Sequence, residues 1–292
     1  MRGQPQQFDP RQNMRTGDFE IFYYRDAAPG PVAIHHHDFY EVYFFLSGQV
    51  EYRVEGSVYR LEPGDVLLIS PMELHQPLIQ PNRESYERVV LWINRTYLEQ
   101  LSTGEVSLTQ CFDCTRPGHN NLLRPTDMDR TGISARLQEL TREAHSTDYG
   151  AALWAASSIV QLMVELNRMA LRPAKIENTE NERTLVSQVL DYIGEHYDES
   201  ISLDSLAQQF YVSKFHLSHA FRQSVGASLY HYIQLKRLLI ARQMLRNGVS
   251  PGAVCQSCGF GDYANFYRAF RSKYGASPRE YLADACRQQS PP

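Results

Sequence analysis

The richest cluster of reactive side chains in the sequence is HHHDFYE, residues 35–41. Side chains alternate along a strand, so a strand here would place His35, His37 and Glu41 on one face and leave His36 exposed on the other. Two imidazoles and a carboxylate can hydrogen-bond a small effector. They can also hold a divalent metal ion, because imidazole suits Zn, Fe, Ni and Cu and the carboxylate widens that choice. We favour effector binding and keep the metal ion as the alternative.

Aromatic residues lie close to this run in the sequence. They are Tyr40, Tyr43, Phe44, Tyr52 and Trp92. Most of them are expected in a hydrophobic core, but Tyr43 and Trp92 are candidates for stacking on a carbohydrate ring at the mouth of a pocket. The predicted ligand is therefore a small polyhydroxylated effector such as a sugar.

The five cysteines include two pairs with C-x-x-C spacing, Cys111 with Cys114 and Cys255 with Cys258. Four thiolates would suffice for zinc, but about 140 residues separate the pairs, far more than in zinc modules. Cys255 and Cys258 fall on apolar positions, where cysteine acts as a small buried hydrophobe. For the first pair, in a loop-like stretch, a redox or metal role is the minor alternative.

Charge is distributed unevenly along the chain. Residues 1–182 carry 17 Lys and Arg against 25 Asp and Glu, whereas residues 201–292 carry 11 against 4. A basic end on an acidic body indicates that this end meets a polyanion. No apolar run approaches the roughly 20 residues of a membrane span, and the polar N-terminus lacks the apolar core of a signal peptide. We expect a cytoplasmic protein that does not enter a membrane.

The basic end contains a pair of short helices, predicted from SLDSLAQQFYVSKFHLSHAFRQS over residues 202–224. Ser202 and Ser213 are typical N-caps, and apolar residues at helical spacing form an inner stripe. The second helix carries an outer face made of Lys214, Phe215, Ser218, His219 and Arg222. Two short helices joined by a tight turn, the second with a polar face, are typical of a helix-turn-helix DNA-binding unit. We call the second helix of such a unit the reading helix.

A second unit of the same kind follows. Ser250-Pro251 predicts its first helix, because proline is favoured at the first helical position. Asp262 caps its reading helix, whose outer face is Tyr263, Ala264, Tyr267, Arg268 and Arg271. A helical run over residues 228–247 joins the units and spans roughly 28 Å, close to one DNA turn of about 34 Å. The two reading helices are therefore predicted to enter successive major grooves on one face of a duplex.

This region resembles the DNA-binding domain of the AraC/XylS family over about 90 residues. The matching pieces are SLDSLAQQFYVSKFHLSHAFRQSVGASLYHYI, the 237–245 helix, and GFGDYANFYRAFRSKYGASPREY. The chain departs from the family pattern at Pro251, at Val254-Cys255 and at Leu282. These departures put the contact details of the second unit in doubt.

The resemblance implies roles for the outer side chains. The base-edge readers would be Phe215, Ser218, His219, Tyr263, Ala264, Tyr267 and Arg268. Arg268 is the best candidate for a bidentate contact to guanine, because its fork matches O6 and N7. Lys214, Arg222 and Arg271 would bind phosphate and set register without reading sequence. For Phe215 and Tyr263, partial packing in the core is the alternative.

The first hundred residues alternate strand-like runs, such as EVYFFLSGQVEYRV and YERVVLWI, with turn formers at Gly48, Gly56 and Pro63-Gly64-Asp65. The segment resembles the cupin-type sensing domain of AraC-type regulators. That resemblance adds His75 to His35, His37 and Glu41 as the fourth residue of an effector or metal site. The second cupin motif is imperfect here, because Glu73 replaces the expected glycine and the interval is one residue short.

The predicted architecture is multidomain, β followed by α. Residues 1–125 form a cupin-like β-barrel that senses the effector, and residues 126–172 form a helical dimerisation element. Residues 173–183 are a linker that begins at Pro173, and residues 184–292 form an all-α domain with tandem helix-turn-helix units.

The predicted function is regulation of transcription in response to a small-molecule effector, with no catalytic residues. The expected partners are double-stranded DNA, a small effector, a second copy of the chain and, for an activator, RNA polymerase. One alternative is a metal-dependent cupin enzyme with an appended DNA-binding domain. Another is an architectural DNA-binding protein with a vestigial sensing domain. The sequence does not distinguish activation from repression.

Overall fold

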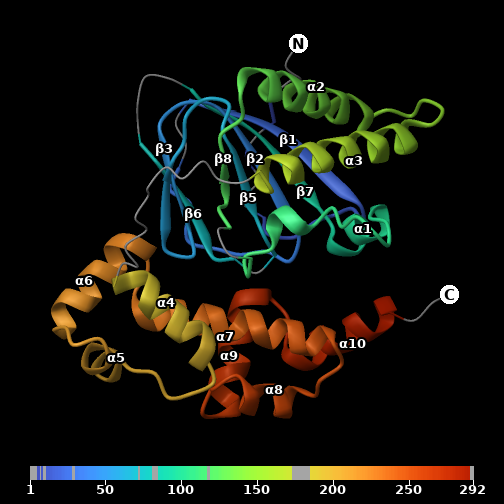
Figure 1. Ribbon diagram of the computed structural model, residues 1–292. Coiled ribbons are helices and arrows are strands. Elements are labelled where there is room, and N and C mark those ends of the chain that lie inside the picture. Colours follow the sequence, from blue (N-terminus) through green and yellow to red (C-terminus); the bar gives the residue numbers. More distant parts are fainter. Residues whose placement is uncertain are drawn as a thin grey trace. The chain divides into compact units, whose positions relative to one another are not determined.

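The computed structural model describes residues 5, 6, 8, 11–27, 30–71, 73–80, 85–116, 119–172 and 185–289, with backbone alone for 284–289. The chain divides into two compact units, residues 1–180 and 181–292, shown in Figure 1. The predicted linker 173–183 lies outside the described residues.

The N-terminal unit is built on two antiparallel sheets. Its strands are β1 (Phe19–Asp26), β2 (Tyr40–Ser47), β3 (Val50–Val54), β4 (Ser57–Arg60), β5 (Val66–Ile69), β6 (His75–Ile79), β7 (Tyr86–Ile93) and β8 (Leu122–Leu123). One sheet has the order β1-β7-β2-β5-β8 and the other β4-β3-β6. Glycines with positive φ at positions 48, 56 and 64 occupy the predicted turns.

The five-stranded sheet is buried on both faces. Along β2, Val42 and Phe44 belong to one apolar cluster, and Tyr43 and Phe45 belong to another. Successive side chains of a strand point to opposite faces, so β2 separates these two clusters. The second cluster also contains Tyr52 and its neighbours on β3, and it therefore lies between the two sheets. Glu41 shares the alternation of Tyr43 and Phe45 and belongs to this inner face.

Two antiparallel helices, α2 (Asp127–Glu143) and α3 (Ala151–Ala170), cover the other face of this sheet, as Figure 1 shows. Their buried side chains follow a helical spacing, with Ile133, Leu137 and Leu140 on α2. Thr126 and Asp129 form a capping box at the start of α2, near the first residue of the predicted helical element 126–172. The short helix α1 (Arg95–Leu101) and the 3-10 turn η1 (Gln110–Phe112) complete the described helices of this unit.

The C-terminal unit is helical throughout its described part. Its helices are α4 (Leu185–His196), α5 (Leu203–Gln209), α6 (Lys214–Val225), α7 (Leu229–Arg246), α8 (Pro251–Ser257), α9 (Tyr263–Tyr274) and α10 (Pro278–Gln289). Helices α5 and α6 form the first helix-turn-helix, and α8 and α9 form the second. The fold class predicted from the sequence is confirmed: a β-sheet domain with helices precedes an all-helical domain.

The predicted caps account for the start of each short helix. The side chains of Ser202, Ser213 and Ser250 accept hydrogen bonds from backbone N–H groups in the first turns of α5, α6 and α8. Asp262 does the same for α9. Both reading helices, α6 and α9, end at a glycine in the left-handed conformation, Gly226 or Gly275. The two units thus share one backbone plan.

A close contact joins the two helix-turn-helix units. The Arg237 guanidinium of α7 donates to the backbone oxygens of Tyr197, at 2.7 Å, and Glu199, at 2.6 Å, in the loop before α5. Gly259, in the turn of the second unit, has a φ of +69°, and a Cβ there would lie 2.6 Å from the backbone oxygen of Asp198. Glycine is therefore required at this junction, which fixes one unit against the other.

One local prediction about the histidine run is wrong. His36 was expected on an exposed strand face, but it is only 2% exposed. The reason is that β2 begins at Tyr40, so residues 35–37 lie in the segment before the strand and strand alternation does not apply to them. His35 instead forms an isolated bridge with His75.

Candidate functional site

The outer side chains of the two reading helices are exposed to solvent, with one exception. Lys214, Phe215, Ser218, His219 and Arg222 of α6 are all exposed, as are Tyr263, Ala264, Arg268 and Arg271 of α9, while Tyr267 is half-buried. Phe215 is 82% exposed, although it is a large apolar residue. Packing in the core therefore does not explain Phe215.

The two reading helices border one hollow of about 760 Å³. Ser218 of α6 lines it together with Asn265 and Arg268 of α9, and α7 contributes Tyr230 and Gln234. Both reading helices therefore border this hollow on the same side of α7. The 18 residues of α7 span roughly 27 Å at the standard helical rise, which is compatible with successive turns of a duplex.

A chain of polar contacts holds the Arg268 side chain on α9. Its Nη2 donates to Oδ1 of Asn265 at 2.6 Å, and the Asn265 amide donates to the Asp262 carboxylate. Asp262 is in turn the N-cap of the helix. Sequence reasoning missed Asn265, although its position three residues from both Asp262 and Arg268 marks it as a neighbour of each on the helix surface.

Two of the predicted phosphate-binding residues already have partners within the protein. Lys214 forms an ion pair with Asp204 of α5. Arg271 donates to the Tyr267 hydroxyl at 3.3 Å. Both Lys214 and Asp204 are well exposed, so solvent weakens their attraction, and a phosphate can replace the carboxylate at little cost.

The N-terminal unit encloses a cavity of about 230 Å³ between its two sheets. Of the predicted effector residues, His35, Glu41, Tyr43 and Trp92 line it, whereas His37 and His75 are buried and are not among its lining residues. Pockets for drug-sized ligands span roughly 300–1,000 Å³. The cavity therefore suits a small molecule.

Further residues line this cavity that sequence reasoning missed. They are Phe8, Arg11, Gln12, Tyr24, Pro31, Val32, Ala33, Pro77, Ile79, Tyr86, Arg88 and Val90, and Tyr52, which the sequence marked only as an aromatic near the histidines, lines it as well. Tyr86, Arg88 and Val90 could have been found, because they alternate along β7 with Trp92 and so share its face. The residues before β1 gave no such signal.

Polar groups in this cavity have partners within the N-terminal unit. Arg88 forms an ion pair with Asp26, and the Tyr43 and Tyr86 hydroxyls are hydrogen-bonded to each other. Burial raises the pKa of Tyr86 to about 12, so this phenol stays neutral and can donate a hydrogen bond. Aromatic rings and fixed donors therefore surround the space.

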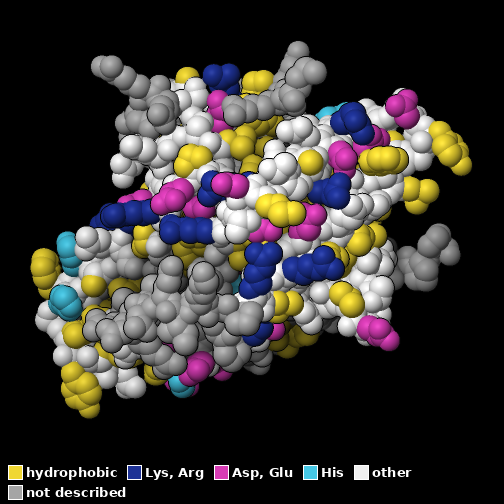
Figure 2. Space-filling view, turned by 45° about the horizontal axis from the view of Figure 1, so that its top comes forward, with side chains coloured by type: hydrophobic (Ala, Val, Ile, Leu, Met, Phe, Trp, Pro, Cys, Tyr) yellow, Lys and Arg dark blue, Asp and Glu magenta, His cyan; other side chains and the backbone are white. Residues whose placement is uncertain are grey.

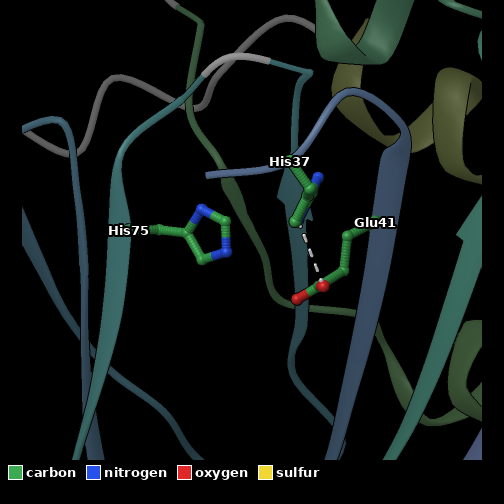
Figure 3. Close-up of side chains that lie close together, drawn as sticks. All are labelled: His37, Glu41 and His75. Carbon is green, nitrogen blue, oxygen red and sulfur yellow. Dashed lines mark ion pairs between the residues drawn. The ribbon is translucent and has the colours of Figure 1, made fainter. Parts of the chain in front are cut away.

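Three buried side chains lie close together, as Figure 3 shows, and one of them, Glu41, lines the cavity. His37 comes from the segment before β2, Glu41 from β2 and His75 from β6. One ligand atom of each lies within 4.8 Å of the others, and His37 Nε2 is 3.3 Å from Glu41 Oε2. We call these three residues the triad. His35, the fourth residue of the predicted set, lies close to His75, with ring centroids 4.2 Å apart, but does not belong to this group.

The electrostatics of the triad differ between its members. Burial raises the pKa of Glu41, but hydrogen bonding and charge from His37, the charge of His35 and the Trp92 indole outweigh it, so this carboxyl has a pKa below its ordinary value. Burial lowers the pKa of His75 well below its ordinary value, and the neighbouring His35 and His37 lower it further. The triad thus combines a carboxylate with a neutral imidazole.

The cysteines with described side chains are free thiols. Cys255 and Cys258 are buried in the core of the second helix-turn-helix, as predicted. Cys111 is also buried, in η1 rather than in a loop, and burial raises its pKa to about 12. A thiol with such a pKa is a poor nucleophile at neutral pH, which argues against a redox role for Cys111.

Comparison with known families agrees with both halves of this description. Residues 18–110 match the model described as "AraC-like ligand binding domain", and residues 206–284 match the one described as "Helix-turn-helix domain". The chain belongs to the AraC family of transcription regulators. Members of this family bind DNA through the helix-turn-helix domain and carry a ligand-binding domain, and the family is one of regulators rather than enzymes.

Relatives within the AraC family are distant. The chain is 26% identical over 247 residues to the "HTH-type transcriptional activator RhaS" of Salmonella schwarzengrund, covering 84% of this chain and 86% of RhaS. The RhaS protein of Enterobacter sp. (strain 638) matches to the same extent. Among solved structures, the DNA-binding domain of AdpA in complex with a target DNA is 28% identical over 36% of this chain and 96% of that chain, with a TM-score of 0.34. No described helix is both long and apolar enough to cross a membrane.

Proposed function

We propose that this AraC-family chain regulates transcription by reading two neighbouring major grooves of one duplex, under the control of a small polyhydroxylated effector bound between its two sheets. The observation that carries the DNA-binding part is the common hollow that Ser218 of α6 and Arg268 of α9 both line. Two exposed, capped reading helices on one side of a single spacer helix match the geometry of successive grooves.

In this proposal the outer side chains divide into two classes. Phe215, Ser218, His219, Tyr263, Ala264, Tyr267 and Arg268 meet base edges. Lys214, Arg222 and Arg271 bind phosphates. Arg268 supplies the one guanidinium among the base readers, and guanine is its expected partner. The phosphate contacts set affinity and register.

The effector site is the cavity of about 230 Å³. Glu41 supplies a buried carboxylate that accepts hydrogen bonds from hydroxyl groups, and Tyr43, Tyr86 and Arg88 supply donors. Trp92 and Tyr52 offer apolar ring faces. Walls that combine flat apolar rings with fixed donors and acceptors favour a small ring with several hydroxyl groups.

We propose that the chain acts as a homodimer through the end of the α2–α3 hairpin. Tyr149 and Leu153 are exposed there, and Trp154 is 56% exposed. Figure 2 shows hydrophobic side chains, in yellow, at this end of the hairpin. Four other α3 residues (Ile159, Leu162, Met163 and Leu166) are buried against the sheet, so the exposed residues are the part of α3 that a second copy can cover.

Replacing Trp154 with Glu is expected to shift a dimer toward monomer, because a charge would be buried in the interface. The matched control is Met128→Glu, at an exposed position on the other end of α2. Sedimentation measures both, and a monomeric unsubstituted chain would contradict the proposal.

The two RhaS relatives are named activators, and we propose the same direction of control here, which makes RNA polymerase a partner. Effector binding can change DNA binding only if the effector prefers one arrangement of the protein over another. In vitro transcription from a bound promoter, with and without effector, measures the direction. A fall in transcript on effector addition would contradict activation.

The DNA-binding proposal is tested by selecting bound sequences from a random duplex pool. The expected result is a site with two conserved blocks about one helical turn apart, centre to centre. The affinity for that site should fall steeply with salt, because several phosphates are neutralised. Equal affinity for selected and random duplexes would show that the protein binds DNA without reading sequence, as an architectural protein would.

The effector is sought by thermal unfolding in the presence of pentoses, hexoses and polyols. A ligand that binds the native state raises the unfolding temperature. Glu41→Gln should abolish the shift while leaving DNA binding intact. The absence of a shift with every polyhydroxylated compound, together with a shift by an aromatic or aliphatic acid, would overturn the sugar assignment and leave the DNA-binding proposal standing.

A further inference from the structure

We infer that the spacer helix α7 itself contacts DNA, through Tyr230 and Gln234, at the minor groove that lies between the two major grooves. The observation that carries this inference is that both side chains line the hollow that Ser218 of α6 and Arg268 of α9 border. The inference rests on the proposed function, because it needs both reading helices on one duplex. It adds a third site of contact, and with it a dependence on base pairs that no reading helix touches.

The position of α7 on the duplex follows from the shape of B-DNA. On one face of a duplex, two successive major grooves are separated by a minor groove, which a phosphate backbone borders on each side. A segment that joins two reading helices seated in those major grooves must therefore cross the minor groove. A helix with its side chains is roughly 10–12 Å wide, and the minor groove is only about 6 Å wide. The backbone of α7 thus stays above the groove, and only its side chains reach the DNA.

Core packing does not account for Tyr230. This residue is 76% exposed, whereas its neighbours Leu229, Tyr232 and Ile233 on α7 are at most 8% exposed. Gln234 lies four residues further along the helix, so it shares a face with Tyr230. Along the helix axis the two residues are about 6 Å apart, a distance similar to the minor-groove width of about 6 Å. Tyr230 can therefore reach one backbone and Gln234 the other.

Tyr230 and Gln234 bring no positive charge to the DNA. A hydroxyl group and a carboxamide can each donate a hydrogen bond to a phosphate or sugar oxygen. Arg237 lines the same hollow, but its guanidinium donates to the backbone oxygens of Tyr197 and Glu199. The predicted phosphate-binding residues of the reading helices lie outside this lining. The contribution of α7 to affinity is therefore expected to be independent of salt, unlike that of the phosphate-binding residues.

Contacts to both backbones make binding depend on the width of the minor groove. Tracts of A·T pairs have a narrow minor groove, whereas G·C-rich segments favour A-like geometry, in which this groove is wide. A narrow groove brings the two backbones within reach of two side chains on one helix. We therefore expect a preference for A·T pairs between the two conserved blocks of the DNA site, where the reading helices make no contact.

The test measures binding of the full chain to the duplex selected from the random pool. Tyr230→Phe and Gln234→Ala should each lower the affinity by roughly 2- to 10-fold, the worth of one hydrogen bond, and should leave the slope of affinity against salt unchanged. The matched control is Tyr211→Phe, which removes a hydroxyl group from a tyrosine that is 96% exposed and outside the lining of the hollow. This control should bind as the unsubstituted chain does. Circular dichroism confirms that each variant is folded.

Changes in the DNA make the test specific to the minor groove. G·C pairs placed between the two blocks should weaken binding by the unsubstituted chain, and inosine in place of each of these guanines should restore it. Inosine lacks only the amino group that guanine presents in the minor groove, so the major-groove edges stay the same. A chain that carries both Tyr230→Phe and Gln234→Ala should lose most of its response to these changes.

The outcomes separate this inference from the proposed function. If the selected site has two blocks but Tyr230→Phe and Gln234→Ala both bind it as the unsubstituted chain does, α7 makes no contact; the inference is then wrong and the proposed function stands. A full response to the intervening base pairs in the doubly substituted chain would overturn the dependence on groove width. If selection yields no pair of blocks, the proposed function fails and this inference fails with it.

Discussion

The two helix-turn-helix units share a backbone plan but display different chemistry. Both reading helices have 12 residues, begin at a side-chain cap and end at a left-handed glycine. The outer face of α6 presents Phe215, Ser218 and His219, whereas that of α9 presents two tyrosines and Arg268. A fork of guanidinium donors discriminates guanine more strongly than a hydroxyl or a phenyl ring does. The second unit is therefore expected to supply most of the base discrimination.

The two units also differ in what surrounds their charges. Lys214 of α6 forms an exposed ion pair with Asp204 of the preceding helix. Arg268 of α9 is held by the neutral Asn265 amide, which leaves its positive charge uncompensated by that contact. In the first unit, the contact partly screens the charge of Lys214. In the second unit, the contact orients the Arg268 side chain. Four predictions test this comparison.

The largest expected effect is at the junction of the two units. In Gly259→Ala, a left-handed backbone costs about 1–2 kcal/mol, and the methyl group, 2.6 Å from the Asp198 oxygen, adds about 1–3 kcal/mol of overpacking. The control is Gly248→Ala, which also has a positive φ but meets nothing within 4 Å. Urea unfolding followed by circular dichroism measures both. Equal losses would show that the close approach does not exist.

The next effect separates the two reading helices. Arg268→Ala should cost about 1–3 kcal/mol of specific binding and relax preference at a single base pair. Ser218→Ala, at an outer position of α6, should cost less, because a serine makes at most a short hydrogen bond. Binding to the selected site and to single-base variants of it measures both. A larger loss in Ser218→Ala would reverse the assignment of discrimination to the second unit.

Phe215 tests whether an exposed ring contributes to binding or to folding. Phe215→Ala should weaken DNA binding by on the order of 1 kcal/mol, since apolar contact with thymine methyls is lost, and should leave the free energy of unfolding unchanged. The matched control on the same helix is Phe221→Ala, which is fully buried and should cost about 3–5 kcal/mol of stability. Destabilisation by Phe215→Ala would contradict a reading role.

The smallest effect concerns the ion pair of the first unit. Asp204→Asn releases Lys214, and specific binding should tighten by about 0.2–1 kcal/mol, the usual worth of an exposed pair. Lys214→Ala should instead lower the slope of affinity against salt by about one phosphate contact. Titrations at several salt concentrations measure both. An unchanged affinity in Asp204→Asn would show that Lys214 does not reach phosphate.

The helix caps and outer faces of the DNA-binding half were predicted well, because they depend on residues close together in the sequence. Ser202, Ser213, Ser250 and Asp262 cap helices through groups within three residues, so their sequence neighbours suffice to identify them. The outer faces of the reading helices follow from helical spacing alone. Gly259 and Arg237 were visible as landmarks in the sequence, but their contact across the junction was not.

The residues that line the cavity of the N-terminal unit were predicted less completely. Four of the six predicted effector residues line the cavity, but most of the residues that line it were not predicted. Strand alternation failed at His36, because the strand begins only at Tyr40. Phe8, Arg11 and Gln12 line the cavity from before β1, and nothing near them in the sequence connects them with Trp92.

The sequence by itself determined the order of the elements, the capped reading helices and their outer faces, because helix caps and side-chain periodicity depend on neighbours along the chain. Tertiary structure alone decided which side chains meet between the two sheets. His37, Glu41 and His75 come together only when the segment before β2 folds against β6. Such long-range contacts depend on the packing of whole layers, which local sequence does not encode.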